Sequence, residues 1–312
     1  MGRDSQYDAF KKEKSSELKE FRRFSEFLAI SSLKKFSTLG SVKHSQRYGA
    51  LLGKLAYQFA KKDRSIAEYQ IDFCFPELSS FKKQQIVRES FENLGKTLME
   101  ALNIQKIRKN RDFWIRLHNE DVVNQVIEKG KGVIFIFGHF GNWELLGLVY
   151  EMLGIKGIGI ESPIGDVKLD GILSASRKSE NIQLIPRGNT SSAKNILKCF
   201  RNNQAFLFAF DQDIKVQSVF VDFFGKKAST AKGAAFFAQK FNVPVVSVFG
   251  ARNKEGVHDY YFELLSESPY QNSKFEINKL TQIYTLAVEK HIRRFPNQWV
   301  WFHRRWKTQP DQ

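Results

Sequence analysis

The sequence predicts an α/β fold with a mostly parallel central sheet flanked by helices, preceded by an N-terminal helical region. From about residue 130 onward, short apolar runs alternate with segments of helical periodicity, which is the pattern of repeated βαβ units. The run VIFIF at 133–137 is apolar at every position, as in a strand covered on both faces. These observations place an α/β core at residues 121–312 and a basic, amphipathic helical region at residues 1–120.

The N-terminal region combines positive charge with helical periodicity. Residues 1–64 hold fifteen basic and seven acidic side chains, which is half of the net charge of +16. Apolar residues then recur at helical spacing among basic neighbours, at Tyr48, Leu51, Leu52, Leu55 and Phe59. This spacing fits a helix lying on an anionic membrane surface or a helix packed against the protein body. A packing helix is predicted to begin near Ser79 or Ser80.

Strands and helices alternate through the predicted core. Buried strands are expected at 133–137, 155–160, 182–185, 205–210 and 243–249. Helices are expected near 122–129, 166–178, 191–201 and 231–241, with a further strand at 257–265 and a final helix at 280–294. Parallel strands joined through helices present their carboxyl ends at one edge of the sheet, and open sheets of this kind bind ligands there.

Composition limits the classes of partner and cofactor. The chain has 49 Lys and Arg against 33 Asp and Glu, so an anionic partner is expected: nucleic acid, an anionic membrane, a phosphorylated substrate or an acidic carrier protein. Two distant cysteines give neither a disulfide framework nor a zinc site, and no metal is expected. The longest run without charged residues is Gly132–Trp143, shorter than the roughly 20 apolar residues of a membrane-spanning helix.

A histidine and a carboxylate lie where the strand at 133–137 gives way to a helix. His139 lies in a glycine-flanked turn, Asn142 is placed to cap the helix, and Glu144 lies in its first turn. A histidine in this position can take a proton from a hydroxyl, while the carboxylate fixes its tautomer. The chain has no G-x-S-x-G nucleophile motif, so the attacking hydroxyl belongs to a substrate. With helix amides near Asn142 available to an oxyanion, acyl transfer to an alcohol is the predicted reaction class.

The same spacing occurs a second time, at His258 and Glu263. These residues lie in VHDYYFELL, which alternates like a strand, so their side chains point to opposite faces. Spacing alone therefore does not identify the site.

Other candidate substrate-binding residues follow the neighbouring strands. Asp211, Gln212 and Asp213 follow the strand at 205–210 and are expected to face the same crevice. Since no His or Cys accompanies the two acids, a structural or substrate-orienting role is favoured over a metal site. Arg177 and Arg187 lie on the expected substrate side, where arginine grips phosphate in bidentate fashion.

The segment VFVDFFGKKAST is unusually aromatic for a loop. Phe223, Phe224 and Gly225 are expected either to line a groove for an acyl chain or to belong to the core. Thr230 is expected to open the next helix, whose first amide groups can receive a phosphate.

Several blocks, in this order, resemble the bacterial lipid A biosynthesis acyltransferases, the lauroyl and myristoyl transferases of the glycerolipid acyltransferase superfamily. They are FCFPELS, FENLGKTLMEAL, GKGVIFIFGHFGNWE, DQD with VFVDFFGKKASTAKGAAFFAQKFNVPVV, and PNQWVWFHRRWK. The family's H-x4-D/E motif maps onto His139 and Glu144, its D-Q-D segment onto Asp211–Asp213, and its F-F-G loop onto Phe223–Gly225. Where family members carry an arginine after the second strand, this chain has Glu161, Ser162 and Pro163.

The resemblance implies transfer of a fatty acyl group from acyl carrier protein, or coenzyme A, to a hydroxyl of an anionic glycolipid, the lipid A precursor. It implies no metal or redox cofactor. It also implies peripheral or monotopic attachment, without a spanning helix, to an anionic membrane surface at the cytoplasmic face of the bacterial inner membrane.

Three alternatives remain open from the sequence. An acyltransferase of the same chemistry can use another acceptor, such as lysophosphatidate, a mannolipid or an aminolipid. A thioesterase would move the acyl group to water. The net charge also permits a nucleic-acid-binding protein, although the chain has no RNP, KH or zinc-finger signature and nucleic acid is not the expected partner.

Overall fold

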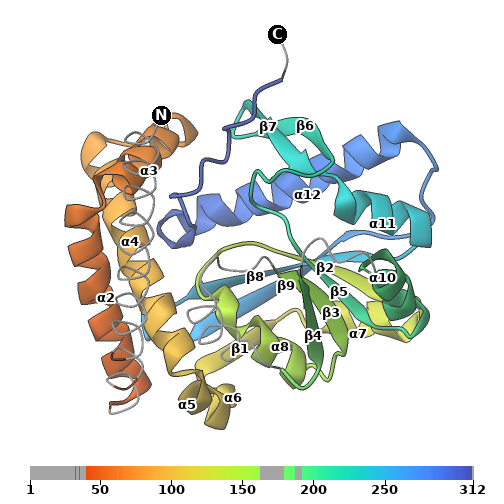
Figure 1. The fold of residues 1–312 in the computed structure, drawn as a ribbon, viewed down its shortest axis with the longest axis horizontal. Coiled ribbons are helices and arrows are strands. Elements are labelled where there is room, and N and C mark those ends of the chain that lie inside the picture. The colour runs from red at the N-terminus through yellow and green to blue at the C-terminus, as the bar shows by residue number, and fades with distance from the viewer. Residues whose placement is uncertain (1–31, 33–34, 36–39, 162–178, 187–191, 311–312) are drawn as a thin grey trace, which may run out of the picture.

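A seven-stranded sheet forms the centre of the computed structural model, which describes residues 32, 35, 40–161, 179–186 and 192–310 (Figure 1). Its strand order is β1-β9-β8-β2-β5-β3-β4. The strands are β1 (Ile115–His118), β2 (Val133–Phe137), β3 (Gly157–Glu161), β4 (Ile182–Pro186), β5 (Ala205–Ala209), β8 (Val245–Arg252) and β9 (His258–Ser266). Every neighbouring pair is parallel except β8 and β9. The predicted mostly parallel sheet is confirmed.

The central strand β2 contributes to both hydrophobic cores. Ile134 and Ile136 pack on the face covered by α11 (Gly233–Phe241) and α12 (Lys274–Arg294). Val133 and Phe135 pack on the face covered by α7 (Asp121–Glu128) and α8 (Leu146–Met152). Alternate residues of a strand point to opposite faces of the sheet, and helices cover both faces here. All four side chains are therefore fully buried. This is the physical reason for the uninterrupted apolar run.

The described residues form further helices around the sheet. They are α2 (Val42–Phe59), α3 (Lys61–Cys74), α4 (Ser80–Leu102), α5 (Ile104–Lys109), α6 (Arg111–Trp114), α10 (Ser192–Arg201) and the 3-10 helices η1 (Trp143–Leu145) and η2 (Pro296–Gln298). The helix expected at 166–178 lies outside the described residues. Among the described helices, none is long and apolar enough to cross a bilayer.

Small residues bring α2 close to α4, and the two helices lie side by side (Figure 1). A Cβ added to Gly95 of α4 would come within 2.1 Å of the Gly49 carbonyl oxygen of α2, so this crossing needs glycine. The larger apolar residues of α2 point outward instead: Leu51, Leu55 and Phe59 are 54%, 48% and 81% exposed. Within the part of the chain that the structure describes, most of this apolar stripe is therefore exposed, whereas Leu52 is half-buried.

Two elements differ from the sequence prediction. The four-residue edge strand β1 was not predicted; it lies N-terminal to the boundary expected at residue 120 and pairs with β9. The expected aromatic loop is an antiparallel hairpin of β6 (Ser218–Phe223) and β7 (Lys226–Ala231). Phe224 and Gly225 form its two-residue turn with φ of 52° and 72°, the left-handed conformation that such turns require. The alternation V-F-V-D-F was the signal for this strand.

Candidate active site

His139 lies in the turn after β2, at the carboxyl edge of the sheet. Its Nδ1 lies 2.9 Å from Oδ1 of Asp211, and its backbone N–H donates to Oδ2 of the same carboxylate at 2.8 Å. The indole Nε1 of Trp299 also donates to Oδ2, at 2.8 Å. Asp211 directly follows Phe210 after β5, the parallel neighbour of β2, and is 2% exposed. The sheet order therefore brings together two residues that are 72 positions apart.

The environment of Asp211 fixes the tautomer of His139. Burial raises the pKa of Asp211, but the charge of His139 and the hydrogen bonds from His139 and Trp299 outweigh it and hold this pKa at about 2. Asp211 is therefore a carboxylate at neutral pH and can only accept hydrogen bonds. The proton of a neutral His139 imidazole must then reside on Nδ1, and Nε2 is the ring nitrogen that carries the lone pair.

Glu144 lies near His139 at the start of η1. Its backbone N–H donates to the Asn142 side chain at 3.1 Å, which confirms the predicted cap, and its carboxylate accepts from Nε1 of Trp143 at 3.0 Å. The rings of Trp143 and His139 lie edge to face with centroids 5.1 Å apart. His139 and Glu144 line the same cavity, while the carboxylate hydrogen-bonded to Nδ1 is that of Asp211.

The cavity has a volume of about 280 Å³ and lies at the carboxyl ends of β2, β3 and β5, beside the first residues of β4. Its apolar lining comprises Phe137, Leu146, Gly147, Gly159, Ile160, Ile182, Leu184, Leu207, Ala209 and Ile214. Its polar and aromatic lining comprises His139, Trp143, Glu144, Glu161 and Gln212. An apolar pocket with a few convergent polar groups at this edge of a sheet is typical of a site for a small or lipid-like ligand.

Comparison with known proteins identifies the family. Residues 11–308 match the profile of the bacterial lipid A biosynthesis acyltransferases. The chain belongs to this family. It is 27% identical over 270 residues to the lipid A biosynthesis lauroyltransferase of Escherichia coli strain K12, which covers 85% of this chain and 86% of that protein. The lipid A biosynthesis palmitoleoyltransferase of the same strain is 25% identical over 274 residues, which are 84% of this chain and 84% of that protein. A lipid A biosynthesis acyltransferase of Haemophilus influenzae is 24% identical over 274 residues, which are 84% of this chain and 82% of that protein. The protein is therefore an O-acyltransferase.

The acyltransferase uses the three residues of its D-Q-D segment differently. Asp211 contacts His139, and Gln212 lines the cavity. Asp213 is not among the residues that line it: its carboxylate accepts from the backbone N–H and the hydroxyl of Thr308 at 2.9 and 3.2 Å. Asp213 thus ties down the C-terminal segment. In the described part of the chain, no group of three or more His, Cys, Asp or Glu is arranged to hold a metal ion.

Other candidate residues lie in the core rather than on the cavity wall. Phe223 and Phe224 are 0% and 7% exposed, and Phe223 stacks on Trp306 at 5.1 Å. Gly225 forms the hairpin turn. The expectation that Thr230 opens a helix is wrong: it lies in β7, fully buried, and its hydroxyl accepts from the guanidinium of Arg305. Arg177 and Arg187 lie outside the described residues.

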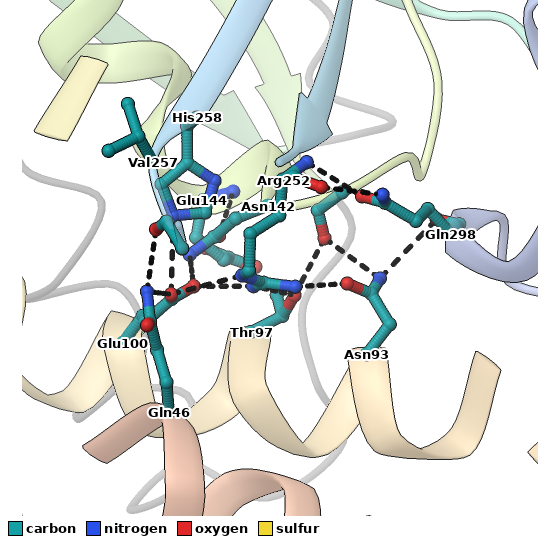
Figure 2. Close-up of polar contacts among 12 residues, drawn as sticks. Gln46, Asn93, Thr97, Glu100, Asn142, Glu144, Arg252, Val257, His258 and Gln298 are labelled. Atoms are coloured by element: carbon teal, nitrogen blue, oxygen red, sulfur yellow. Dashed lines mark hydrogen bonds and ion pairs between the residues drawn. The ribbon is translucent and has the colours of Figure 1, made fainter. Parts of the chain in front are cut away.

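Sequence reasoning missed a buried polar network behind the turn at residues 138–142, which carries His139 (Figure 2). Asn93, Thr97 and Glu100 of α4 contact Arg252 of β8, and all four are less than 9% exposed. The signal was present in the spacing, because polar residues at i, i+4 and i+7 share one face of a helix. The adjacent apolar stripe masks this signal, because it accounts for the packing of α4 by itself.

Proposed function

We propose that this enzyme transfers a fatty acyl group from a thioester of acyl carrier protein or coenzyme A to a hydroxyl of a lipid A precursor. The observation that carries the proposal is His139, held by a buried carboxylate on the wall of an apolar cavity. The names of the relatives support a lipid A-type acceptor. The net charge of +16 suits both a phosphorylated glycolipid and an acidic carrier protein.

In the proposed reaction, Nε2 of His139 takes the proton of the acceptor hydroxyl. The hydroxyl oxygen forms a bond to the thioester carbonyl carbon, the C–S bond breaks, and the departing thiolate takes the proton back from the imidazolium. Asp211 positions the ring and, with Glu144 on the cavity wall, stabilises its positive charge. His139 and Glu144 thus act as the catalytic pair of the H-x4-E motif.

The oxyanion that forms on the thioester carbonyl oxygen requires a hydrogen-bond donor. Most backbone N–H groups at the start of η1 are already used. The backbone N–H groups of Glu144, Leu145 and Leu146 are already hydrogen-bonded, to the Asn142 side chain, the Asn142 carbonyl and the Trp143 carbonyl. The N–H of Trp143 has no hydrogen bond to the described residues and belongs to a cavity-lining residue. We assign the oxyanion to this amide.

The transfer assay that tests this function separates donor and acceptor. With a tetra-acylated lipid A precursor, lauroyl thioesters of acyl carrier protein and of coenzyme A are supplied in parallel. We expect mass spectrometry to show a product heavier by one acyl group, formed from at least one donor. Release of free fatty acid at the same rate without acceptor would indicate a thioesterase, and acylation confined to lysophosphatidate would replace the proposed acceptor.

A second acceptor class is favoured by Glu161, which lines the cavity where relatives were expected to carry an arginine. A carboxylate in this place suits an acceptor with a basic group, such as an aminolipid, better than one with a phosphate. An aminolipid added to the same assay decides between them: preferential acylation of the aminolipid would support this candidate over the lipid A precursor.

Membrane attachment is proposed through the outer face of α2. Leu51, Leu55 and Phe59 present an exposed apolar stripe, and Arg47 and Lys54 beside it are also exposed. An amphipathic helix with this distribution lies in the plane of an anionic bilayer surface, with its apolar face among the acyl chains. We propose peripheral attachment by this face at the cytoplasmic side of the bacterial inner membrane.

We expect Leu51→Glu to weaken binding to vesicles of anionic phospholipid roughly 10- to 150-fold, because burial of a leucine contributes about 1.5–3 kcal/mol. Co-sedimentation with phosphatidylglycerol vesicles measures this. The matched control is Leu286→Glu on α12, where the leucine is 51% exposed against 54% for Leu51. Equal losses for the two variants, or none for Leu51→Glu, would contradict attachment through α2.

A further inference from the structure

One buried face of α4 consists of polar side chains. Asn93, Thr97 and Glu100 are 7%, 2% and 0% exposed and lie at positions i, i+4 and i+7. Burying such groups costs free energy unless each is hydrogen-bonded, and apolar residues of similar volume would fill the same space without that cost. The partners of these three side chains therefore indicate what the polar face does.

Two of these three side chains bind the backbone of the turn at residues 138–142, which carries His139 and is called the catalytic turn below. The hydroxyl of Thr97 donates to the carbonyl oxygen of Gly141 at 2.6 Å, and the Asn93 amide donates to the same oxygen at 3.1 Å. The N–H of Gly141 donates to the carbonyl of Gln298 at 3.0 Å. Gly141 has φ of +51°, and a Cβ there would come within 2.9 Å of the Gly250 carbonyl oxygen. The turn is thus clamped between α4, β8 and the C-terminal segment.

Glu100 holds the other end of the turn through Asn142. The Asn142 amide donates to Oε2 of Glu100 at 2.7 Å, while its oxygen accepts from the backbone N–H of Glu144 at 3.1 Å. The hydroxyl of Tyr260 donates to the Asn142 carbonyl at 2.5 Å. The position of Glu144 on the cavity wall therefore depends on a carboxylate in another helix, 44 residues earlier in the chain (Figure 2).

Glu100 is charged in spite of its burial. Desolvation raises its pKa, but the charges and hydrogen bonds of Arg252 and His258 outweigh that and hold the pKa far below its usual range. Nε of Arg252 donates to Oε1 at 3.1 Å, and Nε2 of His258 lies 3.2 Å from the same oxygen. Arg252 also donates to Asn93 and Thr97, so it joins all three side chains of the α4 face.

We propose that Asn93, Thr97, Glu100 and Arg252 are positioning residues, which fix the turn so that His139 and Glu144 face the cavity at a set separation. This inference rests on the proposed acyl transfer. None of the four residues is among those that line the cavity, and the hydrogen bonds end on the backbone and cap between the two catalytic side chains. Misplacement of a catalytic group by about 1 Å costs up to roughly 10²-fold in rate, which gives a reason to retain a polar network in a core.

Thr97→Val tests the proposal with the smallest change. It removes the hydroxyl that donates to Gly141, and we expect kcat to fall about tenfold with KM within about twofold of the wild type. The matched control is Thr285→Val: Thr285 is 1% exposed, and its hydroxyl donates to the Thr281 carbonyl of the same helix, α12. We expect the control to keep both constants. An equal loss of kcat in the two variants would mean that the network only stabilises the fold, and it would overturn the proposal.

Glu100→Gln is the second variant, in case Thr97→Val does not fold, and Glu151→Gln is its control. The carboxylate of Glu151 pairs with Arg108 and accepts from the backbone N–H of Glu180 at 3.2 Å. Histidine side-chain NMR supplies a readout independent of turnover: the resonances of His139 should move in Thr97→Val and Glu100→Gln and stay in the two controls. If the wild type transfers no acyl group, the proposed function fails, and the NMR comparison still decides the positioning role. Unmoved His139 resonances in folded Thr97→Val and Glu100→Gln would overturn it.

Discussion

We expect His139→Ala to lower the turnover of acyl transfer roughly 10²- to 10⁴-fold, because the variant would lose the proposed base that takes the proton of the acceptor hydroxyl. The fold should persist. The His139 side chain is 22% exposed, and the carboxylate of Asp211 keeps hydrogen bonds from the backbone N–H of residue 139 and from Trp299. Steady-state rates with a lauroyl thioester and a thermal melting curve measure the two quantities. Near wild-type activity would rule out His139 as the base.

The two glutamates at the same spacing from a histidine provide the control. Glu144→Ala should lower turnover to a similar extent, because Glu144 shares the cavity with His139. Glu263→Ala should have little effect: Glu263 points out of β9 and pairs with Lys290, whereas His258 points inward to Glu100. Equal losses at both glutamates would mean that the catalytic pair was wrongly chosen.

Asp211→Asn should also reduce turnover roughly 10²- to 10⁴-fold, by imposing the wrong tautomer on His139. Two N–H groups, from the His139 backbone and the Trp299 indole, donate to Oδ2, and only Nδ1 of His139 faces Oδ1. The single oxygen of asparagine is therefore held at the Oδ2 position. The NH₂ group of asparagine then points at Nδ1 of His139, which must accept a hydrogen bond and therefore cannot carry the proton. The proton moves to Nε2, and the proposed base loses the lone pair that would take the proton of the acceptor hydroxyl.

Asp213→Asn is the matched control for this variant. Asp213 is 2% exposed, as Asp211 is, but its carboxylate bonds to Thr308 and not to His139. We expect it to change stability and leave kcat within a fewfold of the wild type. Histidine NMR should show the tautomer change in Asp211→Asn alone. A similar loss of kcat in the two variants, with both folded, would exclude a specific role for Asp211 in orienting His139.

Much of the fold followed from local patterns. The strand at 133–137 was predicted with the bounds that the structure shows, and α10 and α11 begin within two residues of their expected starts. The hairpin of β6 and β7 was missed although its alternation was present, because its aromatic content was attributed to a loop. The edge strand β1 has four residues, too few for a periodicity to be recognised.

The contacts of the site were less accessible. Asp211 was expected in the crevice, but its pairing with His139 requires β5 to lie directly beside β2, although β3 and β4 intervene in the sequence. The apolar stripe of α2 was recognised, but its outward orientation follows from the fit of Gly49 against Gly95, which no spacing reveals. Arg252 and Glu100 are 152 residues apart, and nothing local to either residue indicates the other.

The sequence by itself determined the α/β class, the central strand and the turn that carries His139, Asn142 and Glu144, because periodicity, glycine and capping act over a few residues. Only the tertiary structure decided which carboxylate reaches Nδ1 of His139, which side chains clamp the turn, and which face of α2 meets solvent. These depend on the order of strands and on the close packing of helices distant in the chain, and that packing is settled by the shapes of whole surfaces rather than by any local pattern.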